Sequence, residues 1–364
     1  MAEAERNKLI KKIEDIRGSK VITYITSDRP NILTQIDEGD LREFFNHIMK
    51  YKGEKIDLFL YSQGGATNVP WALTNIIKEY ASEFCVLIPY RAFSAATLIA
   101  LGADNIVMTK TGFMGPVDPS VWNQFNPLFG NQFIPISVED VSGYQALLRE
   151  KFGINDQANV SRGFEILSNA VHPLALGNVY RQYLKSRDDV RKIIQLHLNP
   201  TTEKEKIDKI VEVLVEKLYY HGHHINRKEA AKIGLNIQNA ENFSKNNFNL
   251  TDVMWDLYKD YEEYLQLLIP YRDELPSHGN SRKIPIKCIE SSTLSSSFNI
   301  EQSLTNFNFP AGSIMVKINN EPAVYIPGNP PQIIPLLTNG RPIFLNSAIY
   351  DKEERLIWSR KTIP

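Results

Sequence analysis

The sequence has only two cysteines and no long apolar run. Cys85 and Cys288 lie far apart among apolar neighbours, which is typical of reduced, buried thiols rather than of a disulfide. The longest apolar stretch, around residues 95–103, is far shorter than the roughly 20 residues of a membrane-spanning helix. The first residues are charged and amphipathic and lack the apolar core of a secretory signal. These absences predict a cytoplasmic protein with no membrane span.

Neither sign of charge dominates, and the usual nucleotide and zinc motifs are missing. The chain has 41 Lys+Arg against 42 Asp+Glu, and no run of basic residues that would mark a nucleic-acid-binding face. It contains no GxGxxG, Walker A or HExxH pattern. We therefore expect no nucleic acid partner, no cofactor and no metal. With 364 residues, of which 43% are hydrophobic, the chain is long enough for a large core and a second, smaller domain.

The first part of the chain alternates apolar strand-like runs with helical patterns. Such alternation with short connections predicts a mainly parallel sheet covered by helices. The expected strands are 21–26, 56–61, 84–89 and 105–109, and the expected helices between them are 41–51, 70–80 and 94–102. A long helical region then follows over 138–220, with breaks near Asn155 and at 199–201.

The character of the chain changes after about residue 242. An aromatic-rich helix is expected over 250–268. Packing of this helix against the main domain is favoured over a role as an interface. The polar, Ser-rich segment 276–297 predicts a linker. Short β-like runs are expected at 283–289, 314–318, 323–326 and 343–345, with a final hairpin over 348–358. We predict three parts: an α/β domain over 1–242, a bridging helix and linker over 243–280, and a small β-rich C-terminal domain over 281–364.

Two segments have the features that acyl-transfer hydrolysis requires. Gly64-Gly65 follows a predicted strand, and glycine there allows a sharp turn and an unobstructed N–H. Ser94 follows the next strand and begins an Ala-rich helix, where free N–H groups favour developing negative charge. Each alone is ordinary, since a serine at a helix start is usually an N-cap. Together they predict Ser94 as a nucleophile, with the Gly65 and Ala95 N–H groups as oxyanion donors.

These segments resemble the serine dehydrogenase proteinase family of the Clp-protease/crotonase superfamily, which is related to the signal peptide peptidase A type serine proteases. The likeness covers roughly residues 5–240 and is most specific up to Pro119. It is carried by Asp57-Leu58-Phe59-Leu60-Tyr61-Ser62-Gln63-Gly64-Gly65, by Ser94-Ala95-Ala96-Thr97, by Gly115-Pro116-Val117-Asp118-Pro119, and by His221 with Glu229-Ala230-Ala231-Lys232-Ile233-Gly234. It implies a Clp/crotonase-type fold, a peptide or protein substrate, and homo-oligomers.

The resemblance also implies a triad in the chain order Ser, Asp, His. Carried over residue by residue, this gives Ser94, Asp118 and His221, in which the carboxylate would hold the histidine and stabilise its charged form. The segment His221-Gly222-His223-His224 departs from the family's His-Asp-Tyr-Pro, so His172 stays open as an alternative base. Ala96 stands where the family has glycine, a mild change in a helix.

Three other interpretations remain beside this one. A Ser-Lys dyad, as in the related signal peptide peptidases, would use Lys151 or Lys185, although both have charged neighbours and a catalytic lysine must lose its proton. A non-catalytic scaffold or peptide-binding protein could retain the same cleft. Acyl-CoA enzymes share the oxyanion hole but lack a serine nucleophile. The histidine cluster at 221–224 lacks a nearby cysteine or acidic ligand and does not predict a metal site.

Overall fold

The fold is described from a computed structural model, in which two compact units are distinguished. The first unit comprises residues 1–26, 35–260 and 289–292, and the second comprises 27–34, 261–288 and 293–364. The structure describes residues 3–117, 120–121, 124–130, 132–217, 222–272, 281–307, 314–318, 321–328, 330–335, 341–345 and 348–363. The predicted domain boundaries at 242 and 280 stay predictions.

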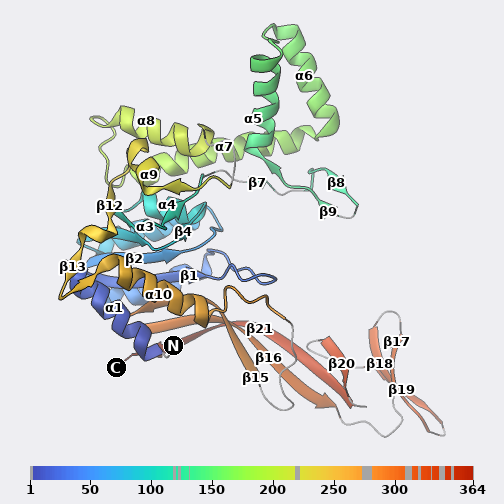
Figure 1. The fold of residues 1–364 in the computed structure, drawn as a ribbon. Helices are drawn as coiled ribbons and strands as arrows, with labels where there is room; N and C mark the ends of the chain where they lie inside the picture. The colour runs from blue at the N-terminus through green and yellow to red at the C-terminus, as the bar shows by residue number, and fades with distance from the viewer. Residues whose placement is uncertain are drawn as a thin grey trace. The chain divides into compact units, whose positions relative to one another are not determined.

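A parallel sheet forms the core of the first unit (Figure 1). Its strands run in the order β12-β5-β3-β2-β1, and neighbouring strands are parallel throughout. All four predicted strands are present, because their β-branched and aromatic side chains are buried on both faces. The bounds are β1 Lys20–Thr26, β2 Lys55–Tyr61, β3 Glu83–Ile88, β5 Asn105–Met108 and β12 Ile237–Asn239.

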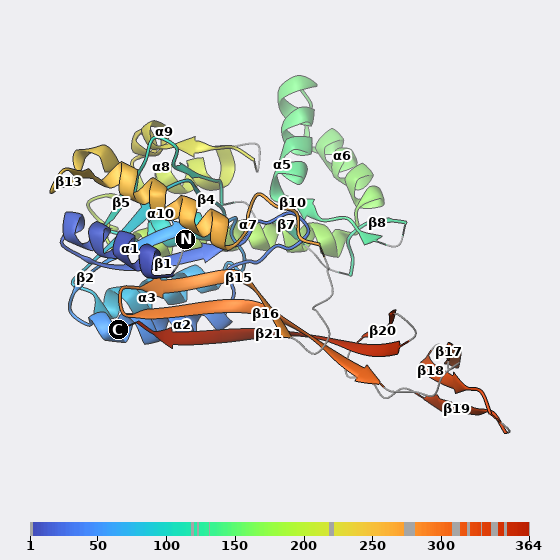
Figure 2. The same cartoon turned by 60° about the horizontal axis from the view of Figure 1, so that its bottom comes forward.

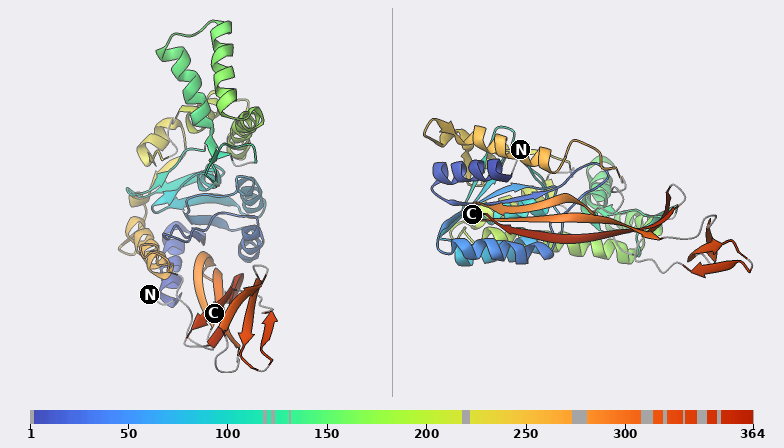
Figure 3. Two further views of the ribbon diagram at one scale, coloured as in Figure 1. Left: turned by 90° about the vertical axis from the view of Figure 1, so that its right-hand side faces the viewer. Right: turned by 90° about the horizontal axis from the view of Figure 1, so that it is seen from below.

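Helices cover both faces of this sheet (Figures 2 and 3). One face carries α1 (Glu3–Arg17) and α10 (Leu250–Tyr264), which belongs to the first unit through Asp260. Met254, Leu257 and Tyr258 of α10 are buried, so this aromatic-rich helix packs on the main domain as predicted. The other face carries α2 (Gly39–Ile48) and α3 (Val69–Tyr80). The α/β Clp-like fold class predicted from the sequence is confirmed.

The long helical region is divided into several helices at the predicted breaks. In Figure 1, α5 and α6 stand away from the sheet as a hairpin. Ser137 and Asp140 form a capping box at the start of α5, and Asp156 caps α6. A further break at Val171-His172 precedes Pro173. The bounds are α5 Val138–Ala146, the π-helical turn η2 Leu147–Lys151, α6 Gln157–Ala170, α7 Pro173–Ile194, α8 Lys204–Glu212, the π-helical turn η3 Val213–Lys217 and α9 Arg227–Ile233.

Short elements complete the first unit. They are α4 Ala95–Leu101, β4 Arg91–Ala92, β6 Phe113–Met114, β7 Ser120–Val121, β8 Leu128–Phe129, β9 Gln132–Phe133, β10 Ile136–Ser137, β11 Ile225–Asn226, β13 Ser244–Lys245, β14 Phe248–Asn249, and the single 3-10 turns η1 Met49–Tyr51 and η4 Ala240–Asn242.

Buried ion pairs hold the N-terminal helix α1 against the rest of the first unit. Arg6 donates to the Glu290 carboxylate at 2.8 Å and to Asp260 at 3.0 Å, and all three side chains are almost fully buried. Arg17 and Ser19 donate to Asp57 in the middle of β2. Burial and the nearby Asp57 carboxylate raise the pKa of the Cys85 thiol to about 12. Cys85 and Cys288 are both buried thiols, as predicted.

The second unit is built from antiparallel strands, so the predicted β-rich C-terminal region is present. Its strands are β15 Ser281–Ser291, of which 281–288 belong here, β16 Leu294–Phe307, β20 Arg341–Leu345 and β21 Ala348–Thr362. A separate small sheet contains β17 Ile314–Ile318, β18 Glu321–Ile326 and β19 Gln332–Pro335.

Two predictions for this region are wrong. The β-like run predicted at 283–289 lies within β15 and is confirmed, so the linker predicted over 276–297 is wrong where β15 and β16 occupy it. The predicted hairpin 348–358 lies within the single strand β21, which pairs with β16 from Leu294↔Thr362 to Phe307↔Ile349. The serine-rich composition of 276–297 was misleading because some of these serines are buried with hydrogen-bond partners. Ser291, for example, is fully buried, and its hydroxyl lies 3.0 Å from His47 Nδ1.

Candidate active site

A small three-stranded sheet brings together segments that are distant in the sequence. β4 and β6 are parallel, and β11 is antiparallel to β6. Met114 of β6 is opposite both Ala92 of β4 and Ile225 of β11. Three segments therefore meet at one end of this sheet. They are the residues after β4, the residues after β6 and the residues before β11. Ser94 follows β4, and the chain leads from β6 toward Asp118 and from His221 into β11.

Ser94 has a backbone conformation that side-chain-bearing residues rarely adopt. Its φ is 52° and its ψ is −115°, and it is the residue immediately before α4. Its hydroxyl makes no capping hydrogen bond to the helix, and the residue is half-buried. Such strain persists only where the surroundings hold it, and it is concentrated at functional sites. Ser94 is therefore held at the turn between β4 and α4 with its hydroxyl uncommitted to the helix.

Gly64 fits directly against Ser94. Its φ is 110°, and a β-carbon there would lie 2.8 Å from the Ser94 Cβ and 3.2 Å from the Ala95 nitrogen. The loop is tied to β4 by the pairing of Ser62 with Ala92. The Ser62 Oγ accepts from the Gly64 N–H at 3.0 Å and from the Thr26 hydroxyl at 2.8 Å. Only glycine at position 64 leaves the start of α4 open.

The Gly65 and Ala95 N–H groups have no hydrogen-bond acceptor among the described residues, whereas the Gly64, Ala66 and Ala96 N–H groups do. On the Gly65 side, Ile36 donates to the Gly64 carbonyl and accepts from the Ala66 N–H, both at 2.9 Å. On the Ala95 side, the Ala96 N–H donates to Phe93 O at 2.9 Å. Two adjacent loops thus each leave one donor uncommitted. This is the arrangement that an oxyanion hole requires.

Thr97 of α4 connects β4 with the segment that follows β6, and it does so from within the core. Its hydroxyl lies 2.8 Å from Ala92 O and 3.0 Å from Gly115 O, and it accepts from the Gly115 N–H at 3.2 Å. Thr97 is fully buried, so these bonds are shielded from water. The side chain fixes the segment after β6 against the start of α4. Its position in the Ser94–Thr97 motif was visible in the sequence, but its role was not.

The histidine segment approaches the same end of the sheet. The His224 ring packs edge-on against Phe93 and Phe113, with centroid distances of 5.0 and 5.4 Å. His223 pairs with Glu229 of α9 at 2.8 Å. The two predicted triad partners of Ser94, Asp118 and His221, lie outside the described residues. Sequence reasoning did not anticipate His224 as the residue in contact with Phe93, although its place in the His cluster was evident.

The alternative bases have other contacts. His172 is exposed at the start of α7, where its Nδ1 accepts from the Leu174 N–H at 3.2 Å and its ring stacks on Phe125. Lys185 forms an ion pair with Asp189 at 2.5 Å and donates to the Thr67 hydroxyl at 3.1 Å. Lys151 is exposed. No contact between these residues and Ser94 occurs in the described part of the chain.

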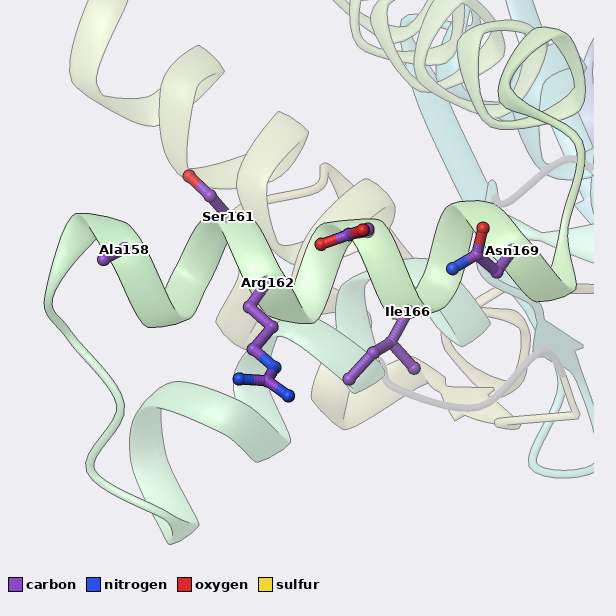
Figure 4. A pocket seen from close by; sticks show the side chains of 6 residues that line it. Ala158, Ser161, Arg162, Ile166 and Asn169 are labelled. Carbon is purple, nitrogen blue, oxygen red and sulfur yellow. The ribbon is translucent and has the colours of Figure 1, made fainter.

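Among the hollows on the described helical part of this unit, two are large. One, of about 730 Å³, is bounded by α5, α7 and η3, with Phe164 of α6 at its edge. The other, of about 460 Å³, runs along α6 and is lined by that helix alone; Arg162 and Ile166 project from the same side of it (Figure 4). A single helix face offers few converging groups, so the first hollow has the better form for a ligand.

The described residues contain neither a metal-ligand cluster nor a helix long and apolar enough to cross a membrane. No group of three His, Cys, Asp or Glu side chains converges in these ranges. None of the helices there has the required apolar window.

Residues 1–128 match the family model described as ClpP-like SDH-type serine proteinase. The predicted resemblance is confirmed. This ClpP-like region contains Gly65, Ser94, Ala95 and Asp118 but ends before His172 and His221. The match therefore includes the predicted nucleophile and the predicted oxyanion donors, whereas both predicted bases lie beyond it.

Two curated relatives are uncharacterized proteins of Methanocaldococcus jannaschii. One is 34% identical over 126 residues, which are 32% of this chain and 42% of the relative. The other is 25% identical over 239 residues, which are 64% of this chain and 73% of the relative. The matched part thus spans less than half of the first relative. Among solved structures, a mutant of the membrane-bound stomatin-specific protease 1510-N is 15% identical, with a TM-score of 0.34, over 60% of this chain and 80% of that one.

Proposed function

We propose that the protein is a serine peptidase that cleaves peptide bonds through an acyl-enzyme on Ser94. The observation that carries the proposal is the pair of uncommitted N–H groups, Gly65 and Ala95, on the two loops that meet at Ser94. The ClpP-like region supports it, because that family is one of serine proteinases.

In the proposed mechanism, Ser94 and the two N–H groups act as above, and Asp118 and His221 take the roles that the family resemblance implies. The Ser94 Oγ attacks the carbonyl carbon of the scissile bond while His221 accepts the hydroxyl proton. The carbonyl oxygen becomes an oxyanion, to which the Gly65 and Ala95 N–H groups donate. His221 then protonates the leaving amine, and water hydrolyses the acyl-enzyme by the reverse sequence. Asp118 accepts from the histidine ring and stabilises its charged form.

The Ser-Lys dyad has less support. A general-base lysine must lie within hydrogen-bond reach of the serine hydroxyl, whereas Lys185 contacts Asp189 and Thr67 instead. Lys151 is exposed on the helical turn η2. A histidine base is favoured because the His221–His224 segment leads into β11, at the end of the sheet where Ser94 lies.

Labelling with a fluorophosphonate tests the proposal directly. The wild-type chain should incorporate the probe at Ser94, and Ser94→Ala should not. Peptide hydrolysis should fall in parallel, by at least about a thousandfold. If folded wild-type protein fails to label and hydrolyses no peptide, the result favours a peptide-binding scaffold. That the protein forms homo-oligomers and is cytoplasmic stays a prediction.

A further inference from the structure

Arg29 is a buried arginine without a carboxylate partner in the described part of the chain. It lies in the loop 27–34 that follows β1, and it is only 5% exposed. Two other deeply buried arginines, Arg6 and Arg17, both form ion pairs with carboxylates. Arginine is rarely buried so deeply unless it is paired, because its charge loses hydration. The charge of Arg29 thus lacks the compensation that the fold gives to the other two.

Two contacts hold the Arg29 guanidinium in place within the second unit. Its Nε donates to Ile269 O at 2.6 Å, and its Cζ lies 5.5 Å from the centre of the Tyr271 ring. The Nη1 and Nη2 groups have no acceptor among the described residues. These are the two nitrogens with which an arginine can bind both oxygens of a carboxylate end-on. The contacts therefore orient Arg29 and leave the binding end of its side chain unused.

A second arginine adds positive charge beside this loop. Arg282 is the second residue of β15, and because side chains alternate along a strand, it shares a face with Ile284 and Ile286. Tyr271 packs on the apolar cluster that contains these two isoleucines. Burial, and after it the nearby Arg282 guanidinium, lowers the pKa of Arg29. Two positive charges therefore lie close together, where a negative group would be stabilised.

Exposed apolar side chains accompany Arg29 along the chain. Leu268 and Ile269 are 75% and 58% exposed, and Leu33 of the Arg29 loop is 68% exposed. Ile269 is also the residue whose carbonyl accepts from Arg29. Arginine among aromatic and apolar side chains is typical of the centre of a protein interface. A carboxylate carries a single charge and loses less hydration than a phosphate group in such surroundings, so it is the favoured anion.

We propose that Arg29 binds the carboxylate of an aspartate or glutamate side chain in an otherwise apolar segment of a partner protein. Its Nη1 and Nη2 groups donate to the two carboxylate oxygens, and Arg282 adds positive charge beside them. Leu33, Leu268 and Ile269 contact apolar side chains next to the acidic residue. The inference does not rest on the proposed peptidase function, because none of these residues belongs to the candidate active site.

The test compares peptides that differ in one charge. Pairs of fluorescein-labelled peptides, amidated at the C-terminus, carry Glu or Gln between apolar residues, and their binding to the full chain is followed by anisotropy. Ser94→Ala is used throughout, so that no peptide is cleaved. In at least one pair the Glu peptide should bind at least about tenfold more tightly than the Gln peptide.

Substitutions of the two arginines should change this ratio. Arg29→Gln should reduce it to about twofold or less, and Arg282→Gln should reduce it in part. Arg29→Lys keeps the charge but not the paired N–H groups, so its ratio should lie between those of wild type and Arg29→Gln. Lys283→Gln removes one charge from an exposed position next to Arg282 and should leave the ratio unchanged. Circular dichroism and urea melts report whether each variant is folded, and Arg282→Gln and Arg29→Lys decide the question if Arg29→Gln is not.

Equal binding, or none, within every pair would overturn the proposal, as would a preference for Glu that the folded Arg29 variants retain. A phosphoserine peptide that binds more tightly than its Glu counterpart would show that the site takes a phosphate group instead. A wild-type dimer that Arg29→Gln dissociates, measured by sedimentation, would make the occupant a second copy of this chain. Either result would overturn the partner proposed for Arg29.

Discussion

Gly64 and Ser94 are in such close contact that a β-carbon on residue 64 would lie 2.8 Å from the Ser94 Cβ. The same carbon would lie 3.2 Å from the Ala95 nitrogen, one of the two uncommitted donors. Ser94, the Ala95 N–H group and the absence of a side chain at position 64 are therefore parts of one arrangement.

Gly64→Ala should displace Ser94 and lower its fluorophosphonate labelling rate at least tenfold. The free energy of unfolding should fall by about 1–3 kcal/mol, because the new methyl group overpacks the contact. Gly53→Ala is a matched control: its φ of 81° is also positive, but no atom lies within 4 Å of its β-carbon. It should cost about 1 kcal/mol in denaturant melts and leave labelling unchanged. Equal labelling of the Gly64→Ala chain and wild type would contradict the role given to this contact.

Thr97→Val should keep the shape of the core and remove the hydroxyl that joins Ala92 to Gly115. The expected loss is about 1–3 kcal/mol of stability, since buried backbone groups lose their partner. Labelling of Ser94 should also slow, and Thr97→Ser should restore it. Thr74→Val is the comparison, because that buried hydroxyl bonds only to carbonyls of its own helix. If Thr97→Val labels at the wild-type rate, Thr97 supports only the fold.

The two candidate bases should respond differently to substitution. His221→Ala should reduce peptide hydrolysis by about 100- to 10,000-fold, the usual contribution of a general base. His172→Ala should keep nearly full activity and lose only a modest amount of stability, because His172 caps α7 and stacks on Phe125. Initial rates at saturating peptide distinguish the two. The reverse pattern would move the base to His172.

The ion pair between Arg227 and Glu241 should give a stability contribution that disappears in acid. Two hydrogen bonds from the Arg227 guanidinium, at 2.6 and 2.7 Å, lower the pKa of Glu241 from 4.5 to about 2. Because the folded-state pKa is lowered, the contribution is complete above about pH 5 and is lost as the pH falls toward 2.

Arg227→Gln should therefore be less stable than wild type by about 1 kcal/mol at neutral pH, a small value because the pair is partly exposed. In urea melts between pH 7 and pH 2, this difference should shrink in the acid range. Arg227→Lys keeps the charge but not the paired geometry, so it should fall between the two. A difference that stays constant down to pH 2 would rule out the pair as its source.

The sequence predicted the parallel sheet because its strands are buried on both faces and read as continuous apolar runs, such as residues 21–26. It could not predict β4, β6 and β11, since two residues show no periodicity. Ser94 and Gly65 could be selected because a known motif joins them. The contacts of Thr97 and His224 could not, because they depend on register between strands that the sequence does not reveal.

In the C-terminal part of the chain, the sequence predicted a linker where the structure has strands. The serine-rich composition of 276–297 suggested a linker, because polar composition usually indicates exposure. In the structure, Ser291 and Ser296 are fully buried. Composition alone cannot distinguish a solvated polar segment from a strand whose polar groups are bonded to one another.

The pairing of Met114 with both Ala92 and Ile225 also sets the order in which the site can form during synthesis. β4 and β6 can pair as soon as Met114 has left the ribosome, whereas β11 is made only after the whole helical region from α5 to α8. Closing so long a loop is slow compared with pairing near neighbours. A nascent or truncated chain that ends before Ile225 therefore has the Ser94 turn without the strand that follows the histidines, and under the proposed function it should not cleave unfolded chains.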